Sequence, residues 1–152
     1  MKGQQTASNP KFGLWSGWQD QGSLWEGIRH CNILIENIYN VIDMTEEEMN
    51  MWAAEAKFLK AYYHFLLFTY YGPIPIVDIN LPISASDNAV RVKRETVDRC
   101  LEYIVQTIDD ALIHLPSRVL SSNDLGRIDR VIAKSIKSRV LVYAASPLFN
   151  GN

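Results

Sequence analysis

Apolar residues recur along this chain in steps of three and four, the spacing that keeps side chains on one face of an α-helix. The pattern predicts amphipathic helices over residues 23–42, 94–115 and 130–145. The stripe of the first helix consists of Leu24, Ile28, Cys31, Ile35, Ile38 and Ile42. The other two stripes consist of Val97, Leu101, Ile104, Ile108, Ala111 and Leu115, and of Ile132, Ile136, Val140 and Tyr143. Each stripe predicts a buried helix face.

A further helix, predicted over residues 45–70, is apolar around most of its circumference. We therefore expect it to lie at the centre of the fold. Thr45 and Glu48 have the spacing of a capping box, and three glutamates stand at the positive end of the helix dipole. Gly72 and Pro73 end the helix, because glycine suits the position after a helix and proline cannot continue one.

The segments between the helices have the composition of turns and loops. Residues 1–22 form an irregular lead-in, and residues 78–92 and 117–127 are predicted to be a surface loop and a polar turn. Residues 73–77, with the sequence PIPIV, must be extended, because each proline disfavours the α region for the residue before it. Ser23 and Asp129 are the predicted caps of the helices that follow them.

These elements predict an all-α fold of two antiparallel long-helix hairpins joined by the extended Pro-rich connection. Steps of three and four average about 3.5 residues, which favours a shallow crossing angle of roughly 20°. Short connections pair the first helix with the second and the third with the fourth. The architecture is of tetratricopeptide type, although no clean period of about 34 residues is present. We expect residues 1–22 to precede one helical-hairpin domain over residues 23–152.

Composition excludes several classes of protein. Of the 152 residues, 47% are hydrophobic and 21% charged, which is a globular composition. Fifteen basic and seventeen acidic residues give a net charge of −2, so no basic surface for nucleic acid is expected. No apolar run reaches the ~18 residues of a membrane span, and no signal peptide is expected. Cys31 and Cys100 set no disulfide framework and are predicted to be small buried residues.

Candidate catalytic chemistry is sparse. His30, His64 and His114 lack the spacing of metal ligands, and His64, on an aromatic helix, is predicted to be a packed core histidine. Asp109 and Asp110 point about 100° apart on a helix and are predicted to be solvated. The sequence has no nucleophile elbow and no glycine-rich phosphate loop. We therefore predict no catalytic residue, no metal site and no cofactor.

The tryptophans of the lead-in are the strongest candidates for a binding surface. They lie in polar, glycine-flanked sequence, where large rings are harder to bury. An indole ring can stack on the flat C–H face of a sugar, and nearby polar side chains can bond its hydroxyls. The candidate ligand-binding residues are Trp15, Trp18, Gln19 and Asp20. The alternative is that both rings fold back onto the helices.

An ordered set of motifs runs from residue 25 to the end of the chain. It begins with WEGIRHCNILIE at residues 25–36 and EAKFLKAYYHF at residues 55–65, and YGPIPIV follows at residues 71–77. It continues with Arg91, DDALIHLP at residues 109–116, Gly126-Arg127 and AKSIKSRVLVYAASPLFNG at residues 133–151. In this order the motifs resemble the SusD/RagB family, and residues 55–65 resemble its most recognisable helix.

The resemblance implies a non-catalytic, surface-exposed lipoprotein of the Gram-negative outer membrane. Such proteins bind oligosaccharides or other nutrients and sit over a TonB-dependent, SusC-like transporter. They are several times longer than this chain, which resembles their N-terminal helical part, without the export signal or lipid anchor. The family's usual Ser or Thr before the third helix stands as Lys93 here, which predicts a weaker cap.

A helical protein-interaction scaffold with no glycan binding is the alternative function. A helical hydrolase would need convergent acid and base groups, and the sequence shows no such pattern. Helical hairpin arrays usually need about three repeats to bury a continuous core. Two hairpins that end in Leu148 and Phe149 therefore predict an exposed apolar patch on the last hairpin.

Overall fold

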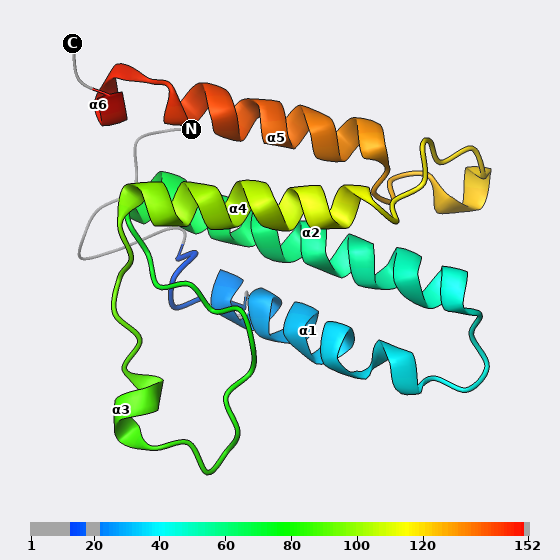
Figure 1. Ribbon diagram of the computed structural model, residues 1–152, viewed down its shortest axis with the longest axis horizontal. Helices are drawn as coiled ribbons and strands as arrows, with labels where there is room; N and C mark the ends of the chain where they lie inside the picture. The colour runs from blue at the N-terminus through cyan, green and yellow to red at the C-terminus, as the bar shows by residue number, and fades with distance from the viewer. Residues whose placement is uncertain (1–12, 18–21, 151–152) are drawn as a thin grey trace.

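The computed structural model describes residues 13–17 and 22–150, and the regular structure within these ranges is helical. Its four long helices are α1 (Leu24–Asn37), α2 (Glu46–Tyr71), α4 (Val97–Leu112) and α5 (Arg130–Ala144) (Figure 1). The short elements are α3 (Asp87–Val90), α6 (Pro147–Asn150) and the 3-10 turns Ile38–Asn40 and Ser122–Asp124. The predicted all-α class is confirmed.

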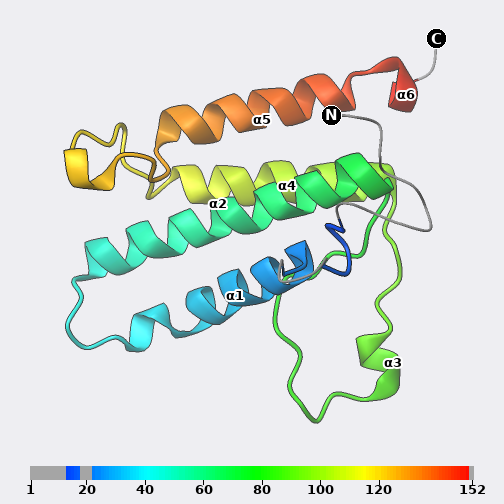
Figure 2. The ribbon, with the colours of Figure 1, turned by 180° about the vertical axis from the view of Figure 1, so that it is seen from behind.

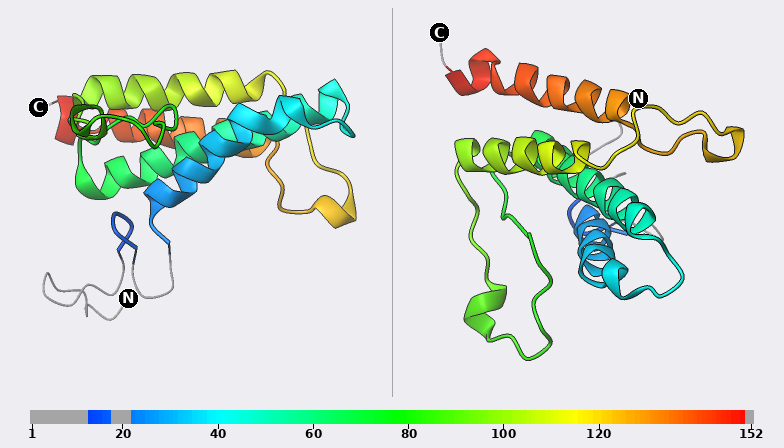
Figure 3. Two further views of the ribbon diagram at one scale, coloured as in Figure 1. Left: turned by 90° about the horizontal axis from the view of Figure 1, so that it is seen from below. Right: turned by 45° about the vertical axis from the view of Figure 1, so that its right-hand side comes forward.

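The central position of α2 organises the fold (Figures 1 and 2). One side of α2 packs against α1, which runs antiparallel to it, and another side packs against α4. Helix α5 runs antiparallel to α4 and forms the outer layer on the side away from α1 (Figures 1 and 3). None of the helices in the described part of the chain is long and apolar enough to cross a membrane.

The core forms where α2 meets its neighbours, because α2 is apolar on most sides. Phe65, Leu67 and Phe68 of α2 are each at most 1% exposed. They share one apolar cluster with Ile28 of α1 and Ile104 of α4. Four alanines of α2 are also buried, and their small side chains let the neighbouring helices approach closely. Burying each large side chain contributes about 1.5–3 kcal/mol, so this cluster is the main source of stability.

Two apolar stripes depart from their predicted course near helix ends. The prediction that Ile42 belongs to the first stripe is wrong, since Ile42 is 99% exposed. Helix α1 ends at Asn37, and the 3-10 turn that follows has a different periodicity, which rotates later residues off the buried face. In α5, Ile132 is 40% exposed and Ala133 is fully buried, so the buried face begins one position later than predicted.

The third long helix is shorter than predicted. Helix α4 begins at Val97 and ends at Leu112, whereas the sequence pattern predicts residues 94–115. Its N-cap is Thr96, whose Oγ1 accepts the backbone N–H of Arg99 at 3.2 Å. The prediction that Lys93 stands at the cap position and weakens it is therefore wrong, because the helix starts three residues after the expected site.

The predicted N-caps of the other three long helices and the predicted end of α2 agree with the structure, whereas α1 ends at Asn37 and not at Ile42. The Glu48 N–H donates to Thr45 Oγ1 at 3.2 Å, and the Thr45 N–H donates to Glu48 Oε2 at 2.9 Å, which is the predicted capping box. The side chains of Ser23 and Asp129 each accept a backbone N–H three residues further on. Gly72 ends α2 with a φ of 68°, a backbone conformation that disfavours residues with a Cβ.

Candidate functional site

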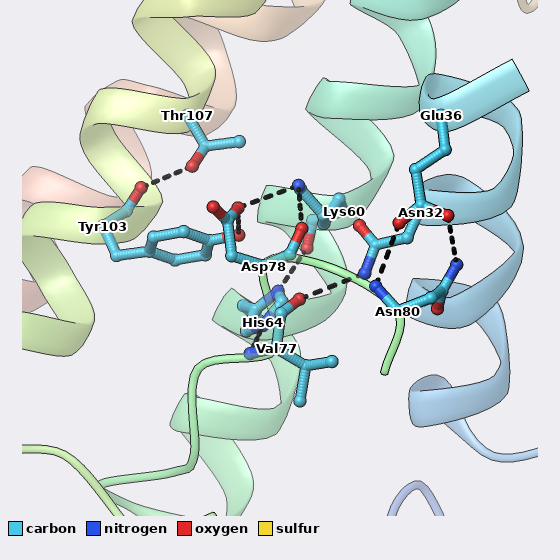
Figure 4. Close-up of polar contacts among 9 residues, drawn as sticks. All are labelled: Asn32, Glu36, Lys60, His64, Val77, Asp78, Asn80, Tyr103 and Thr107. Carbon is cyan, nitrogen blue, oxygen red and sulfur yellow. Dashed lines mark hydrogen bonds and ion pairs between the residues drawn. The ribbon is translucent and has the colours of Figure 1, made fainter. Parts of the chain in front are cut away.

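A polar network holds the extended segment after α2 against the helices (Figure 4). Lys60 of α2 is only 6% exposed, and its Nζ donates to the backbone oxygen of Asp78 at 3.1 Å and to Asp78 Oδ1 at 3.0 Å. The hydroxyl of Tyr103 on α4 donates to the same Oδ1 at 2.8 Å. Asp78 therefore joins α2 to α4 through the segment that the prolines keep extended.

The geometry of this network sets its protonation. Burial acts to raise the pKa of Asp78, but hydrogen bonds from Lys60 and Tyr103 outweigh it and hold the pKa below its usual value. Burial, and after it the hydrogen bond to Asp78, raises the pKa of Tyr103. The phenol thus stays protonated and keeps donating to a carboxylate, while the carboxylate balances the buried ammonium.

His64 is held in the same network as a neutral ring. The ring is fully buried, with Nδ1 2.8 Å from the Lys60 carbonyl oxygen, and Nε2 accepts the backbone N–H of Val77 at 3.3 Å. Because Nε2 accepts, the proton belongs on Nδ1, which donates to the Lys60 carbonyl. Burial lowers the pKa of His64 to about 4. The prediction of a packed core histidine is confirmed.

Helix α1 holds the other side of the extended segment. Asn32, 1% exposed, donates its Nδ2 to the Val77 carbonyl oxygen at 3.4 Å. The Glu36 carboxylate accepts the backbone N–H of Asn80 at 3.0 Å and the Asn80 side-chain amide at 3.2 Å. Residues 74–80 are thus tied to α1, α2 and α4 together (Figure 4). This network, which we call the Asp78 junction, fixes the point at which the long loop before α4 leaves the helices.

Of the two predicted ligand-binding tryptophans, Trp15 lies within the described residues. Its backbone N–H donates to the Tyr71 hydroxyl at 3.2 Å. Its ring meets the rings of Trp25 and Tyr71 edge to face, with centroids 5.0 and 5.2 Å away. The Arg94 guanidinium lies over the same ring, 5.3 Å from its centroid. The structure thus places Trp15 at the C-terminal end of α2 in a cluster of aromatic and cationic groups.

The other predicted ligand-binding residues, Trp18, Gln19 and Asp20, lie outside the described residues. The Trp15 ring is partly buried against the core, which is the alternative that the sequence left open, and it keeps part of its surface exposed. Ligand binding by these four residues stays a prediction.

A charged clamp fixes the connection between α4 and α5 to the N-terminal half of α2. Arg127 Nε and Nη2 donate to the two carboxylate oxygens of Glu55 at 3.0 and 3.1 Å. The guanidinium also lies over the Trp52 ring, 5.0 Å from its centroid. This fork geometry is specific to arginine. The sequence motif Gly126-Arg127 contains one partner of this ion pair. The other partner, Glu55, lies 72 residues away in sequence, so the sequence pattern does not predict the pair.

A groove of about 640 Å³ lies at the end of the helices opposite to Trp15. The start of α2 forms one wall and the turn after α4 forms the other, with the residues Glu46, Glu47, Asn50, Met51, Ile113, His114, Leu115, Pro116, Ser117 and Arg130. Arg130 is already engaged, because its guanidinium donates to the carbonyl oxygens of Leu112 and Ile113 at 3.1 Å each. The groove therefore offers carboxylates and aliphatic surface without a free guanidinium.

The adjacent aspartates have different roles. Asp110 is exposed, as predicted for a solvated helix face. Asp109 departs from that prediction, since both its carboxylate oxygens accept from Lys137 Nζ of α5, at 2.6 and 2.7 Å. The side chain of Asp109 is 40% exposed, so this ion pair contributes modestly to stability. The ion pair holds α4 against α5 and gives no indication of a catalytic cleft.

Candidate metal-ligating side chains are dispersed. His30 and His114 are exposed, whereas His64 is buried in the core. Cys31 and Cys100 are buried free thiols, as predicted. In residues 13–17 and 22–150 no three His, Cys, Asp or Glu side chains gather where a metal ion would need them.

A protein-family model matches residues 17–142 of the chain. It is a SusD-like family described as starch-binding and associating with the outer membrane. No curated protein matches the chain.

Solved structures of SusD-like proteins share the fold. The protein BT4246 is 35% identical with a TM-score of 0.74, over 82% of this chain and 21% of that one. A SusD-like protein from Bacteroides fragilis is 27% identical with a TM-score of 0.70, over 79% of this chain and 23% of that one. A laminarin binding SusD-like protein is 24% identical with a TM-score of 0.70, over 79% of this chain and 25% of that one.

This chain thus spans about a fifth to a quarter of the length of these structures. The helical fold and the family match over residues 17–142 agree with each other. The chain belongs to the SusD-like family.

Proposed function

We propose that this chain is the N-terminal helical part of a non-catalytic, glycan-binding lipoprotein on the surface of the outer membrane. The observation that carries the proposal is the match of residues 17–142 to a family described as starch-binding and associating with the outer membrane. A structural relative named as laminarin binding supports glycans as the class of ligand. The activity belongs to the whole protein, to which this chain contributes a minor share.

The proposed partner is a TonB-dependent, SusC-like transporter in the outer membrane, which would receive the oligosaccharide or other nutrient. The family's association with the outer membrane supports this part of the proposal. We further propose that residues 1–22 are a lead-in and residues 23–152 the helical domain. In that domain the Asp78 junction and the Arg127 clamp would hold the two long connections rigidly against α2.

The proposed ligand contacts in this chain are Trp15, Trp18, Gln19 and Asp20. The surroundings of Trp15 support its candidacy, because an indole ring with an exposed part stands beside the Arg94 guanidinium. Arg94 Nη1 donates to the carbonyl oxygens of Tyr71 and Pro73 at 3.0 and 2.9 Å, which holds the guanidinium over the ring. The part of Trp15 that stays exposed offers apolar surface for the C–H groups of a sugar ring. The backbone of Trp15 is positioned by the Tyr71 hydroxyl, which limits the freedom lost on binding.

Glycan binding by the full-length protein tests the proposal. Calorimetric titration with laminarin, starch and unrelated polysaccharides should show binding to at least one of them. A protein that binds none of a broad panel, yet is retained by its transporter in a pull-down, would be a helical interaction scaffold instead.

The variant Trp15→Ala locates the binding site. We expect it to weaken binding of the identified glycan at least about fivefold, because truncating an aromatic anchor typically costs more than 1 kcal/mol. The matched control is Trp52→Ala. Trp52 is 42% exposed and lies in the N-terminal half of α2, whereas Trp15 packs at the C-terminal end of that helix. Equal affinities for both variants and the unaltered protein would place the glycan site outside the lead-in, without contradicting the family function.

A further inference from the structure

The turn at residues 14–16, which we call the Trp15 turn, lies outside the helices but is bonded to two of them. The carbonyl oxygen of Leu14 accepts the backbone N–H of Leu24, the first residue of α1, at 2.9 Å. The backbone N–H of Trp15 donates to the Tyr71 hydroxyl at the end of α2, at 3.2 Å. These two hydrogen bonds fix the backbone of the turn between the start of α1 and the end of α2.

The ring of Trp15 has a further contact, which comes from the segment before α4. Arg94 is exposed, and its Nη1 donates to the carbonyl oxygens of Tyr71 and Pro73. The negative end of the α2 dipole favours a cation at this place. The same guanidinium lies 5.3 Å from the centroid of the Trp15 ring. Backbone hydrogen bonds thus hold Arg94 where it covers part of the indole.

The contacts of Arg94 differ from those of other arginines in the chain. Arg99 pairs with Glu102, and Arg127 pairs with Glu55. Within residues 13–17 and 22–150, Arg94 has no carboxylate partner at salt-bridge distance. Its hydrogen bonds go to the end of α2, and its charge lies over an aromatic ring, which is the geometry of a cation–π contact.

The end of α2 that supports these contacts is itself fixed by ring packing. Phe68 is 1% exposed and stacks on Phe149, with centroids 5.5 Å apart. The ring of Phe149 also meets that of Tyr143 at 5.4 Å. The predicted apolar patch on the last hairpin is therefore corrected at Phe149, which is covered, whereas Leu148 is 75% exposed as expected. The Trp15 turn is thus held against a well-packed helix end.

We propose that Arg94 is a positioning residue of the glycan site, which fixes the Trp15 ring and acts on the ligand only through that ring. The proposal rests on the proposed function, in which Trp15 contacts the glycan. A ring that is held in place before binding loses less freedom when the ligand arrives. Arg94 supplies this restraint from above the ring, and the Tyr71 hydroxyl supplies it through the backbone.

A double-mutant cycle in the full-length protein tests the proposal, with the glycan identified by calorimetry as the probe. Arg94→Gln should weaken binding about two- to fivefold, the range of an exposed cation–π contact. In the Trp15→Ala background the same substitution should have no further effect, because the ring that Arg94 positions is gone. The matched control is Arg99→Gln, which removes an exposed arginine paired on its own helix and should leave the affinity unchanged.

Three outcomes of this cycle would overturn the proposal. An equal loss in both backgrounds would mean that Arg94 contacts the glycan directly. Tighter binding by Arg94→Gln would mean that the guanidinium competes with the glycan for the ring. Unchanged affinity in both Trp15→Ala and Arg94→Gln would place the glycan site elsewhere, which leaves the family function intact. A protein that binds no glycan at all would instead contradict the proposed function.

Hydrogen exchange of the ligand-free protein gives a second readout. The Trp15 N–H bonds Tyr71 and not Arg94, so faster exchange there means that the turn itself has loosened. We expect Arg94→Gln to speed exchange in peptides that contain this amide at least about threefold, with Arg94→Lys between it and the unaltered protein. Peptides from the middle of α4 should be unchanged, which excludes a general loss of stability. Unchanged exchange at the turn would overturn the proposal whether or not a glycan binds.

Discussion

Acid should destabilise this protein through His64. In the folded state Nε2 accepts the backbone N–H of Val77, and a protonated ring cannot accept it. Burial lowers the pKa of His64 from 6.5 to about 4. Because the folded pKa lies below the unfolded one, the unfolded chain binds the proton more readily. The stability contributed by the neutral ring is therefore present above pH 6.5 and is lost as the pH falls toward 4.

These two pKa values set the magnitude of the effect. Proton linkage gives a loss of about 2 kcal/mol in the free energy of unfolding between pH 7 and pH 5. For a chain of this length, that loss corresponds to a decrease in Tm of roughly 4–8 °C. Asp78 contributes little in this range, because its pKa is lowered from 3.8 and its stabilising effect is lost only at lower pH.

Urea unfolding followed by circular dichroism at pH 7, 6 and 5 measures this dependence. We expect His64→Gln to be less stable than the unaltered protein at pH 7 and to show a much flatter pH dependence, since the titrating group is gone. The matched control is His114→Gln, because His114 is exposed and takes no part in the buried network around His64. The reasoning would be refuted if His64→Gln lost stability with falling pH as steeply as the unaltered protein.

Two other predictions concern packing and the Arg127 clamp. Ile104 is fully buried, so Ile104→Ala should lower the free energy of unfolding by about 2–5 kcal/mol in urea denaturation. Ile42→Ala, at a side chain that is 99% exposed, should change it by less than about 0.5 kcal/mol. Arg127→Lys should cost about 1–2 kcal/mol, because lysine cannot reproduce the two parallel bonds to Glu55. A double-mutant cycle of Arg127→Lys with Glu55→Gln that gives no coupling energy would contradict the clamp.

The local features of the fold could be predicted from the sequence. The apolar stripes predicted three of the four long helices, and the apolar circumference of residues 45–70 predicted α2. The caps at Thr45 and Asp129 placed the starts of α2 and α5 to the residue. Gly72 and Pro73 marked the end of α2 to within one residue. These signals work because helix periodicity and capping hydrogen bonds involve residues three or four positions apart, so the sequence contains both partners of each contact.

Contacts between distant segments were decided by the tertiary structure. Lys60 and Tyr103 both bind Asp78, although they are 18 and 25 residues away from it, and Glu55 meets Arg127 across 72 residues. Lys60 and Glu55 lie on α2, but Asp78 lies in the extended segment and Arg127 in the loop before α5, so no helix periodicity pairs them. Only the packing of α4 and the extended segment on α2 brings opposite charges together. The choice between a buried ion pair and a solvated charge depends on which surface lies opposite, and periodicity along one helix does not contain that information.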